Sequence, residues 1–511
     1  MMNLVEQLKD YNVPNDILEP VTYEYPGFTG DERLFDALDD IITNGKSVCI
    51  HGDSDCDGVF AAKIWQTLFD RLHYKNYRVH EYKERSHVLT IESVSTIIRS
   101  RFNYVLIVDS STNDMDNLKT FVKFGIVPIV IDHHVANYEL DSYPKECIII
   151  NTIIENRLLR EDKFRLSGGA LSFCLAGEYL KRCNKKWKDL SAYGLITLYS
   201  DCIDMTRKLN RGIYYMATSL PTEDLPIYVR HFMHNYDVFC RRFIEFSFAP
   251  KINALFRAEV LSVINKYLFK DNTPGEFDKL IKIIIAIHDN SRKLVNKAVD
   301  SIKRENLNNI VIANLSSASI PIHENKLYNY TGLVANELSG EYGKPSVVLC
   351  DTGTGIKASF RDLLSRNYLP KFKQFCNAAG HGAAFAINLN YMEYNNFMYC
   401  LREMIDKKFY ILGVQENIEL DAGDITPNSL YLNEVARLNE FTGIDIPPVV
   451  LLKRNNLKAT KAYGNTYNYA YKWGDYKIDS KSLIPPGSII KMKPVLTKSI
   501  KIVVLNRNVM I

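Results

Sequence analysis

The stretch CIHGDSDCDG at residues 49–58 decides how this chain folds. Residues 47–50 form a short apolar run typical of a strand, and residues 59–72 place apolar side chains at helical spacing. Between these segments lie one imidazole and three carboxylates, with glycines on both sides where the backbone must turn sharply. Carboxylates this close repel one another, and a divalent cation compensates that repulsion most directly. A solvated acidic turn is the alternative if the stretch is taken alone.

Three other short apolar runs also end in polar residues. Residues 104–108 lead into Asp109, residues 127–131 into Asp132-His133-His134, and residues 147–150 into Asn151-Thr152. Short, continuously apolar strands that alternate with helical segments indicate a parallel sheet covered on both faces. Because ligands bind at the carboxyl ends of such strands, we expect a metal site at that edge. Asp201 follows an apolar helix over residues 190–200, and it either joins this site or is an ordinary helix-end residue.

Composition bounds the class of protein. A chain of 511 residues with 46% hydrophobic and 24% charged residues is typical of a globular protein with roughly two to four domains. Ten cysteines without a CxxC pair indicate a reducing compartment and argue against a zinc ribbon or a disulfide scaffold. No apolar run approaches the ~18 residues of a membrane helix, and we see no secretion signal, so we expect a cytoplasmic protein with no membrane partner. The formal net charge of +4 permits a polyanionic partner without requiring one.

We expect an α/β protein divided into five segments. They are an N-terminal cap at 1–45, a parallel-sheet domain at 46–245, a long helical connector at 246–305, a smaller α/β domain at 306–415, and a linker with an OB-like β-barrel domain at 416–511. The last segment interleaves aromatic and basic residues, a pattern that suits stacking of unpaired bases and that ordinary sheet packing explains nearly as well. The residues concerned are Tyr463, Tyr467, Tyr469, Tyr471, Trp473, Tyr476, Lys458, Lys461, Lys472 and Lys477.

Taken in order, these elements resemble the DHH phosphoesterase family, and within it the RecJ-type single-strand DNA exonucleases. HGDSDCDG at 51–58 is similar to the first motif of that group, VDSS at 108–111 to the second, and DHH at 132–134 to the motif that names the family. SGGALSFCL at 167–175, APKINALFRAE at 249–259, AAGHGAAFAIN at 378–388 and RLNEFTGIDIPP at 437–448 resemble later blocks. The match runs from about residue 45 to the C-terminus, and such an ordered set is far more specific than a bare DHH tripeptide.

The resemblance implies a site for two Mn²⁺ or Mg²⁺ ions. Oxygen donors with some imidazole suit these ions better than zinc, and the imidazole favours manganese. Asp132 is expected to orient a ligand histidine, and His134 to stabilise phosphate charge or protonate the leaving 3′ oxygen. His381 is expected near the scissile phosphate, although without the resemblance a buried structural histidine is the simpler interpretation. The implied metal ligands are Asp55, Asp57, Asp109, His133 and Asp201, with His51 and Asp53 as further candidates.

The resemblance to RecJ also implies a pocket for a terminal 5′ phosphate. Its residues are Arg85, Arg257, Ser359 and Arg361, and each arginine is a surface ion-pair residue in the alternative interpretation. The implied activity is 5′ to 3′ degradation of single-stranded DNA to 5′-mononucleotides in repair, recombination or replication. We expect a monomer whose partners are single-stranded DNA and, by analogy, a single-strand-binding protein or a helicase.

Two other functions are compatible with the same motifs. One is a short-RNA nuclease or cyclic-dinucleotide phosphodiesterase of the DHH family, and the extra segment at 450–511 weighs against it. The other is a replication scaffold that has lost its metals, and the presence of a competent ligand at every candidate position weighs against that.

Overall fold

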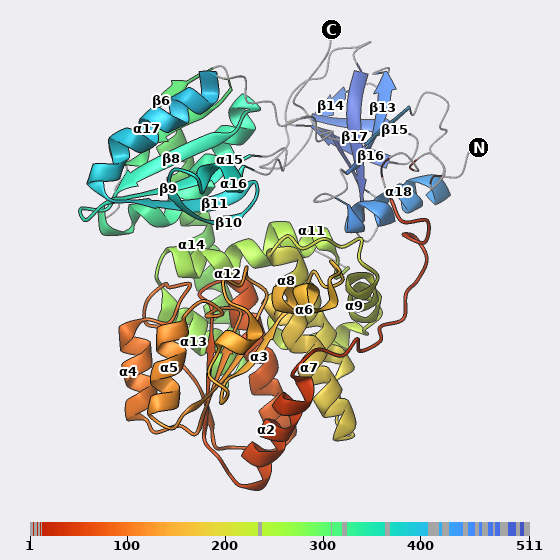
Figure 1. Cartoon of the computed structure of the whole chain (residues 1–511). Helices are drawn as coiled ribbons and strands as arrows, with labels where there is room; N and C mark the ends of the chain where they lie inside the picture. The colour runs from red at the N-terminus through yellow and green to blue at the C-terminus, as the bar shows by residue number, and fades with distance from the viewer. Residues whose placement is uncertain are drawn as a thin grey trace.

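The computed structural model describes most of the chain. The described residues are 13–233, 238–307, 309–318, 324–362, 368–406, 418–421, 429–442, 448–454, 459–461, 469–473, 476–480, 489–496 and 501–504, with Leu4, Leu8 and Tyr11. Figure 1 shows three sheets, one in the lower lobe and one in each of two upper lobes. No helix among these residues is long and apolar enough to cross a membrane.

The first sheet is parallel throughout, as the apolar runs predicted. Its strands are β1 (Val48–Gly52), β2 (Tyr77–Val79), β3 (Tyr104–Val108), β4 (Val127–Asp132) and β5 (Ile148–Asn151), in the order β2-β1-β3-β4-β5. Every neighbouring pair runs parallel. The short strand β2 was not expected, because its three residues YRV lie at the sheet edge and carry a charge in the middle.

Helices cover both faces of this sheet. They are α2 (Asp31–Thr43), α3 (Cys56–Arg71), α4 (Ile91–Arg99), α5 (Met115–Lys123), α6 (Thr152–Leu159), α7 (Gly168–Arg182) and α8 (Ser191–Ser200). Side chains along β3 alternate between two cores: Leu106 and Val108 pack in the core that contains α3 and α7, and Val105 and Ile107 pack in the core that contains α4 and α5. Burial on both faces explains why these strands read as continuous apolar runs.

A helical region joins the first sheet to the second. It contains α9 (Lys208–Thr218), α10 (Ile227–Arg230), α11 (Arg241–Phe243), a π-helical turn (Ile244–Phe248), α12 (Ala249–Arg257), α13 (Leu261–Phe269) and α14 (Pro274–Ser301). The 28-residue α14 begins with a capping box between Thr273 and Glu276, which satisfies two of its otherwise unpaired amide groups. Figure 1 shows α14 between the lower lobe and the second sheet.

The second sheet is mixed rather than purely parallel. Its strands are β6 (Lys303–Asn306), β7 (Val311–Asn314), β8 (Ser346–Asp351), β9 (Ile356–Arg361), β10 (Asn377–His381) and β11 (Ala384–Leu389), in the order β10-β11-β9-β8-β7-β6. β7 and β8 run parallel, and the other neighbours run antiparallel. One face packs on α15 (Thr331–Tyr342), and the other on α16 (Leu369–Phe372) and α17 (Tyr391–Asp406).

The third sheet lies near the C-terminus. Its strands are β12 (Ile418–Asp421), β13 (Val449–Arg454), β14 (Ala459–Lys461), β15 (Tyr469–Trp473), β16 (Tyr476–Ser480), β17 (Ile489–Val495) and β18 (Lys501–Val504), and α18 (Ser429–Phe441) precedes β13. The order is β12-β13-β17-β18-β16-β15-β14. The OB-like barrel stays a prediction, and the aromatic and basic side chains expected to bind bases lie outside what the structure describes.

Contacts between α18 and the first lobe hold the third sheet in place. Tyr199 of α8 donates a hydrogen bond to the carbonyl of Glu440 at 3.0 Å, and the backbone amide of Arg241 donates to the Glu440 carboxylate at 2.9 Å. Burial raises the pKa of Glu440 to about 7 against the opposing effect of Arg241. The division into five segments with the stated boundaries stays a prediction.

Candidate metal centre and phosphate pocket

The acidic loop after β1 places its carboxylates at the start of α3. Asp55 caps this helix, since its Oδ1 accepts a hydrogen bond from the Gly58 amide at 3.0 Å. Asp57, in the first turn, accepts from the amides of Gly168 and Gly169, each at 2.8 Å. These amides open α7, so the loop and the N-terminus of a second helix meet at the carboxyl edge of the sheet.

Two glycines at the start of α7 allow that close approach. A Cβ atom on Gly168 would lie 2.5 Å from the Asp109 carboxylate, and one on Gly169 would lie 2.8 Å from Asp57 Oδ1. Side-chain atoms do not approach this closely, so a larger residue at Gly168 would displace the Asp109 side chain. The SGG sequence therefore makes room for the carboxylates of the first two motifs.

Four predicted ligands converge on one point. The Nε2 atom of His133 lies 3.1 Å from Asp109 Oδ1, 3.5 Å from Asp201 Oδ2 and 3.8 Å from Asp57 Oδ2. Asp109 has a φ of +61° at the end of β3, and its buried Oδ1 accepts no hydrogen bond from the residues that the structure describes. A buried carboxylate oxygen in that state fits a cation ligand.

The energetics of these carboxylates support a bound cation. Burial raises the pKa of Asp57 and of Asp109 well above the usual range. The negative charge of Asp201 raises the pKa of Asp57 further, and that of Asp57 raises the pKa of Asp109 further. Burial also raises the pKa of Asp201 to about 6. A divalent cation removes the cost of ionising them together.

Two more groups of ligand atoms flank this point. Asp109, His133 and His134 form one, and Asp53, Asp55 and His87 form the other; within each group the ligand atoms lie within 4.8 Å of one another. His87 Nδ1 lies 2.9 Å from Asp53 Oδ2. Sequence reasoning missed His87, because it stands in a polar loop outside every motif. We call the seven residues Asp53, Asp55, Asp57, Asp109, His133, His134 and Asp201 the metal edge.

Asp132 organises both histidines of its motif. Its Oδ1 accepts hydrogen bonds from the amides of His133 at 2.7 Å and His134 at 3.2 Å, and pairs with His134 Nδ1 at 2.8 Å. Burial disfavours the His134 cation, yet Asp132 outweighs it and raises the pKa of His134 to about 10. Thr112 donates to the other oxygen of Asp132 through its amide at 3.2 Å and its hydroxyl at 2.6 Å. Asp132 thus holds the ring of His134 through Nδ1 and accepts from the backbone amides of both histidines.

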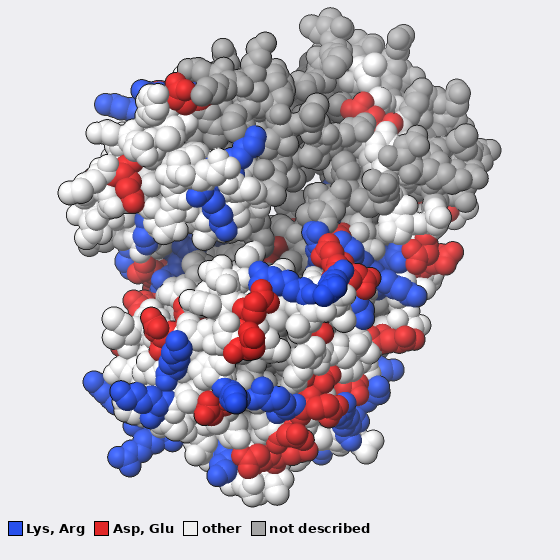
Figure 2. All heavy atoms as spheres, in the orientation of Figure 1, with Lys and Arg blue, Asp and Glu red and all other residues white. Residues whose placement is uncertain are grey.

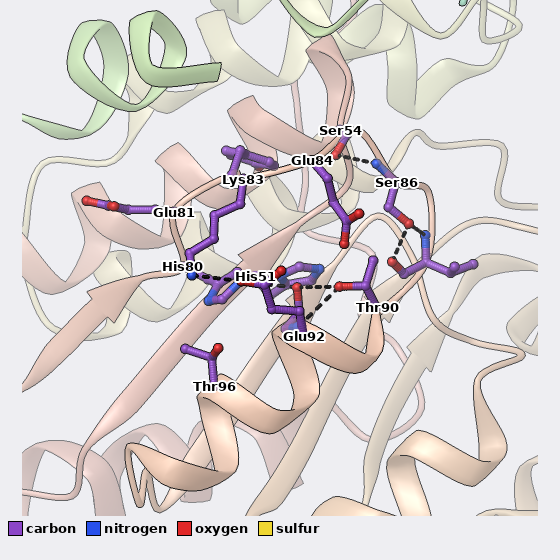
Figure 3. A pocket seen from close by; sticks show the side chains of 13 residues that line it. His51, Ser54, His80, Glu81, Lys83, Glu84, Ser86, Thr90, Glu92 and Thr96 are labelled. Carbon is purple, nitrogen blue, oxygen red and sulfur yellow. Dashed lines mark hydrogen bonds and ion pairs between the residues drawn. The ribbon is translucent and has the colours of Figure 1, made fainter. Parts of the chain in front are cut away.

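His51 lies outside these three groups of ligand atoms. Its ring packs against His80, with centroids 5.2 Å apart, and burial lowers its pKa to about 3. His51 and His80 line one pocket together with Glu81, Glu84 and Glu92, and Figure 3 shows the two histidine rings close together. As a metal ligand His51 stays a prediction.

The arginines expected to bind phosphate come together from different parts of the chain. Arg85 follows β2, Arg257 ends α12 and Arg361 ends β9. Burial lowers the pKa of Arg257 to about 10, and the nearby charges of Arg85 and Arg361 contribute to the shift. None of these three, which we call the arginine cluster, forms an ion pair with a described carboxylate.

Arg361 and Ser359 are held on the second sheet. Arg361 Nη1 donates to the carbonyl of Phe360 at 2.7 Å, and a Cβ atom on Gly332 would lie 2.7 Å from Arg361 Nη2, so this glycine lets the guanidinium lie against α15. Ser359 Oγ lies 2.8 Å from Thr331 Oγ1. The backbone of His381 pairs with Ala384, which pairs with Arg361, and the His381 side chain lies outside the described part of the structure.

Comparisons with known proteins agree with this architecture. The family model "DHH family, N-terminal domain" matches residues 47–195. The crystal structure of RecJ from Thermus thermophilus in complex with Mn²⁺ aligns with a TM-score of 0.72 and 15% identity, over 96% of this chain and 74% of that one. The putative single-strand DNA-specific exonuclease YorK of the SPbeta prophage of Bacillus subtilis is 22% identical over 442 residues, 77% of this chain and 71% of its own.

Residues 47–195 thus match the DHH family model, and the chain has the fold of RecJ. A second structure, exonuclease RecJ bound to manganese, aligns with this chain at a TM-score of 0.58 and 15% identity, over 76% of this chain and 97% of that one. These similarities establish the fold. The donor set of the metal edge, carboxylate oxygen with some imidazole, fits the Mn²⁺ and Mg²⁺ that the Thermus RecJ structures contain.

Proposed function

We propose that this protein is a metal-dependent exonuclease that degrades single-stranded DNA from its 5′ end and releases 5′-mononucleotides. The observation that carries the proposal is the pairing of a crowded anionic site with a crowded cationic one. The loop that carries Arg85 contacts the acidic loop, since the Ser86 amide donates to Ser54 Oγ and His87 Nδ1 lies 2.9 Å from Asp53 Oδ2, so the metal edge lies close to Arg85 of the arginine cluster. A phosphodiester bound between the metal edge and the arginine cluster would present its negative oxygens to the metal ions and to the arginines.

In this proposal the metal edge, together with His87, would hold two Mn²⁺ or Mg²⁺ ions. Asp57, Asp109, His133 and Asp201 would hold one, and Asp53, Asp55 and His87 lie where they could complete the second. When bound, the ions would activate water and neutralise charge on the scissile phosphate.

The protein's own residues supply the remaining chemistry. With Nδ1 held by Asp132, the cationic His134 keeps a proton on Nε2 to donate to a phosphate oxygen or to the departing 3′ oxygen. The arginine cluster binds the terminal 5′ phosphate through planar, bidentate donors, and this contact sets the direction of degradation. His381 is proposed to approach the scissile phosphate from the second sheet, because its strand position is in register with Arg361.

The test is a product ladder from long single-stranded DNA labelled at the 3′ end, with Mn²⁺ present. Progressive shortening of the labelled strand with release of mononucleotides is the expected result. A parallel reaction with a 5′-phosphorylated dinucleotide separates this activity from that of a short-RNA or cyclic-dinucleotide phosphodiesterase. Rapid cleavage of the dinucleotide with no shortening of the long strand would contradict the proposal.

Single-stranded DNA is the proposed substrate partner. The relative YorK is named a putative single-strand DNA-specific exonuclease, and the three arginines of the arginine cluster are suited to binding a terminal phosphate. A single-strand-binding protein or helicase partner and a monomeric state are expectations of the resemblance to RecJ.

A further inference from the structure

The loop between β2 and α4 touches both the metal edge and the arginine cluster. The amide of Ser86 donates to Ser54 Oγ at 3.1 Å, a contact drawn in Figure 3, and His87 Nδ1 lies 2.9 Å from Asp53 Oδ2. Both partners belong to the acidic loop after β1. Arg85 immediately precedes these two residues, so the acidic loop fixes one side of its backbone.

A single asparagine from the second lobe holds the guanidinium of Arg85. Arg85 Nη1 donates to Asn329 Oδ1 at 2.9 Å, and Arg85 Nη2 lies 3.4 Å from His87 Nε2. Arg85 Nε is buried and has no hydrogen-bond partner in the described part of the chain. Asn329 is 5% exposed and precedes α15, which packs on the second sheet.

The nitrogen of the Asn329 side-chain amide contacts the backbone of Arg257, another member of the arginine cluster. Asn329 Nδ2 donates to the backbone carbonyl of Arg257 and to Glu259 Oε1, both at 3.1 Å. Glu259 adopts a φ of +53° just beyond the end of α12, and its other oxygen pairs with Lys326 Nζ at 3.0 Å. The Asn329 amide therefore joins the loop that carries Arg85 to the end of the helix that carries Arg257.

This arrangement opposes the repulsion between two arginines. Arg85 and Arg257 are like charges close enough for Arg85 to disfavour the Arg257 cation, and Glu259 and the metal-edge carboxylates offer Arg85 competing positions. An unanchored Arg85 would relax away from Arg257 and toward one of those carboxylates. Anchored through Nη1, it keeps the buried Nε–H free to donate to a phosphate oxygen.

We propose that Asn329 is a positioning residue for the terminal phosphate: it sets the guanidinium of Arg85 beside Arg257 and thereby determines how strongly the protein distinguishes 5′-phosphorylated from 5′-hydroxyl ends. The inference rests on the proposed function, because it assigns the arginine cluster to a terminal phosphate. It adds a residue that no motif of the sequence contains and that does not itself contact substrate.

The experiment compares one single-stranded oligonucleotide carrying either a 5′ phosphate or a 5′ hydroxyl. Binding is measured by fluorescence anisotropy in EDTA, where no hydrolysis occurs, and kinetics are measured with Mn²⁺. Asn329→Ala is expected to reduce the preference for the phosphorylated end about tenfold, the scale of one charge-assisted hydrogen bond. The change should appear in KM for the phosphorylated strand, with kcat and binding of the hydroxyl strand little altered.

Two further variants test whether the effect is specific to Asn329 and acts through Arg85. Asn306→Ala is the matched control, since Asn306 lies in the same lobe and its Oδ1 likewise accepts from a cation, Lys344 Nζ at 3.0 Å; it should keep the full preference. In an Arg85→Ala background, Asn329→Ala should cause no further loss, because it acts through Arg85.

Each other outcome has a defined meaning. Equal loss of binding to both strands would assign Asn329 to fold stability and overturn the proposal, as would a full phosphate preference in Asn329→Ala. A wild-type nuclease indifferent to the end group would overturn both this inference and the arginine pocket. A wild type that binds phosphorylated ends in an Asn329-dependent way but never cleaves DNA would overturn the proposed function and leave the role of Asn329 standing.

Discussion

The metal edge and the arginine cluster each gather like charges in positions that are largely buried or half-buried. At the metal edge, Asp57, Asp109 and Asp201 lie around a single histidine nitrogen, and burial together with repulsion from neighbouring carboxylates raises the pKa of each. In the arginine cluster, burial is the largest cause that lowers the pKa of Arg85, Arg257 and Arg361. On the face in Figure 2, by contrast, charges of both signs are intermixed over the first-sheet lobe.

The contrast shows how a binding site differs from ordinary surface electrostatics. Folding alone does not favour gathering like charges, because each raises the cost of ionising the next. Their ligands are therefore expected to carry the opposite charge: a divalent cation at the metal edge and a phosphate at the arginine cluster. Four predictions test this complementarity, from the largest expected effect to the smallest.

Removing the charge of Asp109 should have the largest effect. Asp109→Asn keeps a residue that tolerates the positive φ at this position and removes one buried anion. We expect nuclease activity to fall by more than about 100-fold, the upper end of what loss of an outer-shell partner costs a metal site. Asp141→Ala, an acid of the same lobe at an exposed position, is the control. Substantial Mn²⁺-dependent cleavage by Asp109→Asn, with a native circular dichroism spectrum, would remove Asp109 from the metal edge.

A methyl group at Gly168 should damage the same site without changing any charge. Its Cβ would lie 2.5 Å from the Asp109 carboxylate, so Gly168→Ala must displace that side chain. We expect activity and Mn²⁺ affinity to fall about 10- to 100-fold. Gly177→Ala, on the same helix, is the matched control, because its Cβ would come no closer than 3.3 Å to the Trp187 ring. Equal effects of the two substitutions on activity would show that helix packing, not the carboxylate, is responsible.

Removing one cation of the arginine cluster should change end selection rather than chemistry. For Arg361→Ala we expect KM for a 5′-phosphorylated strand to rise by about tenfold or more, since charge-assisted bonds to phosphate contribute roughly 1.5–3 kcal/mol. The rate at saturation should change little. Arg402→Ala is the control, because Arg402 is an exposed arginine of the same lobe that pairs with Glu305. A fall in kcat with an unchanged KM would instead place Arg361 at the reacting phosphate.

The stabilisation by Mn²⁺ should grow with pH. Burial raises the pKa of Asp201 to about 6, so in the metal-free protein this group's contribution to stability is present at low pH and is lost as the pH rises through 6. Metal binding needs the ionised form and must expel a proton at low pH. We therefore expect the melting temperature to rise on Mn²⁺ addition by about 4 °C near pH 7.5 and by less near pH 5. A shift in melting temperature that is larger near pH 5, or is retained by Asp109→Asn, would contradict this.

The first sheet and its ligand-bearing edge could be predicted because three buried strands are continuous apolar runs that end in a ligand residue. Such strands must lie inside a covered parallel sheet, and their carboxyl ends meet at one edge. The fold brings Asp109, His133 and Asp201 together there. The edge strand β2 was not predicted from the sequence, because its three half-exposed residues do not form a continuous apolar run.

Long-range contacts could not be predicted in the same way. His87 stands in a loop and Asn329 in a short 3-10 helix, both outside every motif. Each acquires its role only from a partner far away in sequence, Asp53 for the first and Arg85 and Arg257 for the second. His51 depends on the fold in the same way: its motif position suggests a ligand, and tertiary packing sets its ring against His80. Residue type predicted the kind of chemistry, and tertiary contacts decide which residues come together.

The long helix α14 fixes the spacing between the lobe of the first sheet and the lobe of the second sheet. Its 28 residues extend over about 42 Å and rotate each successive side chain by about 100°. Arg257 precedes this helix and Arg361 follows it, so the relative orientation of their guanidiniums depends on the number of residues in between. One inserted residue would turn the downstream lobe by about 100°, whereas substitutions on the solvent face of the helix would leave that orientation unchanged. Length, rather than composition, is the property of α14 on which the arrangement of the arginine cluster depends.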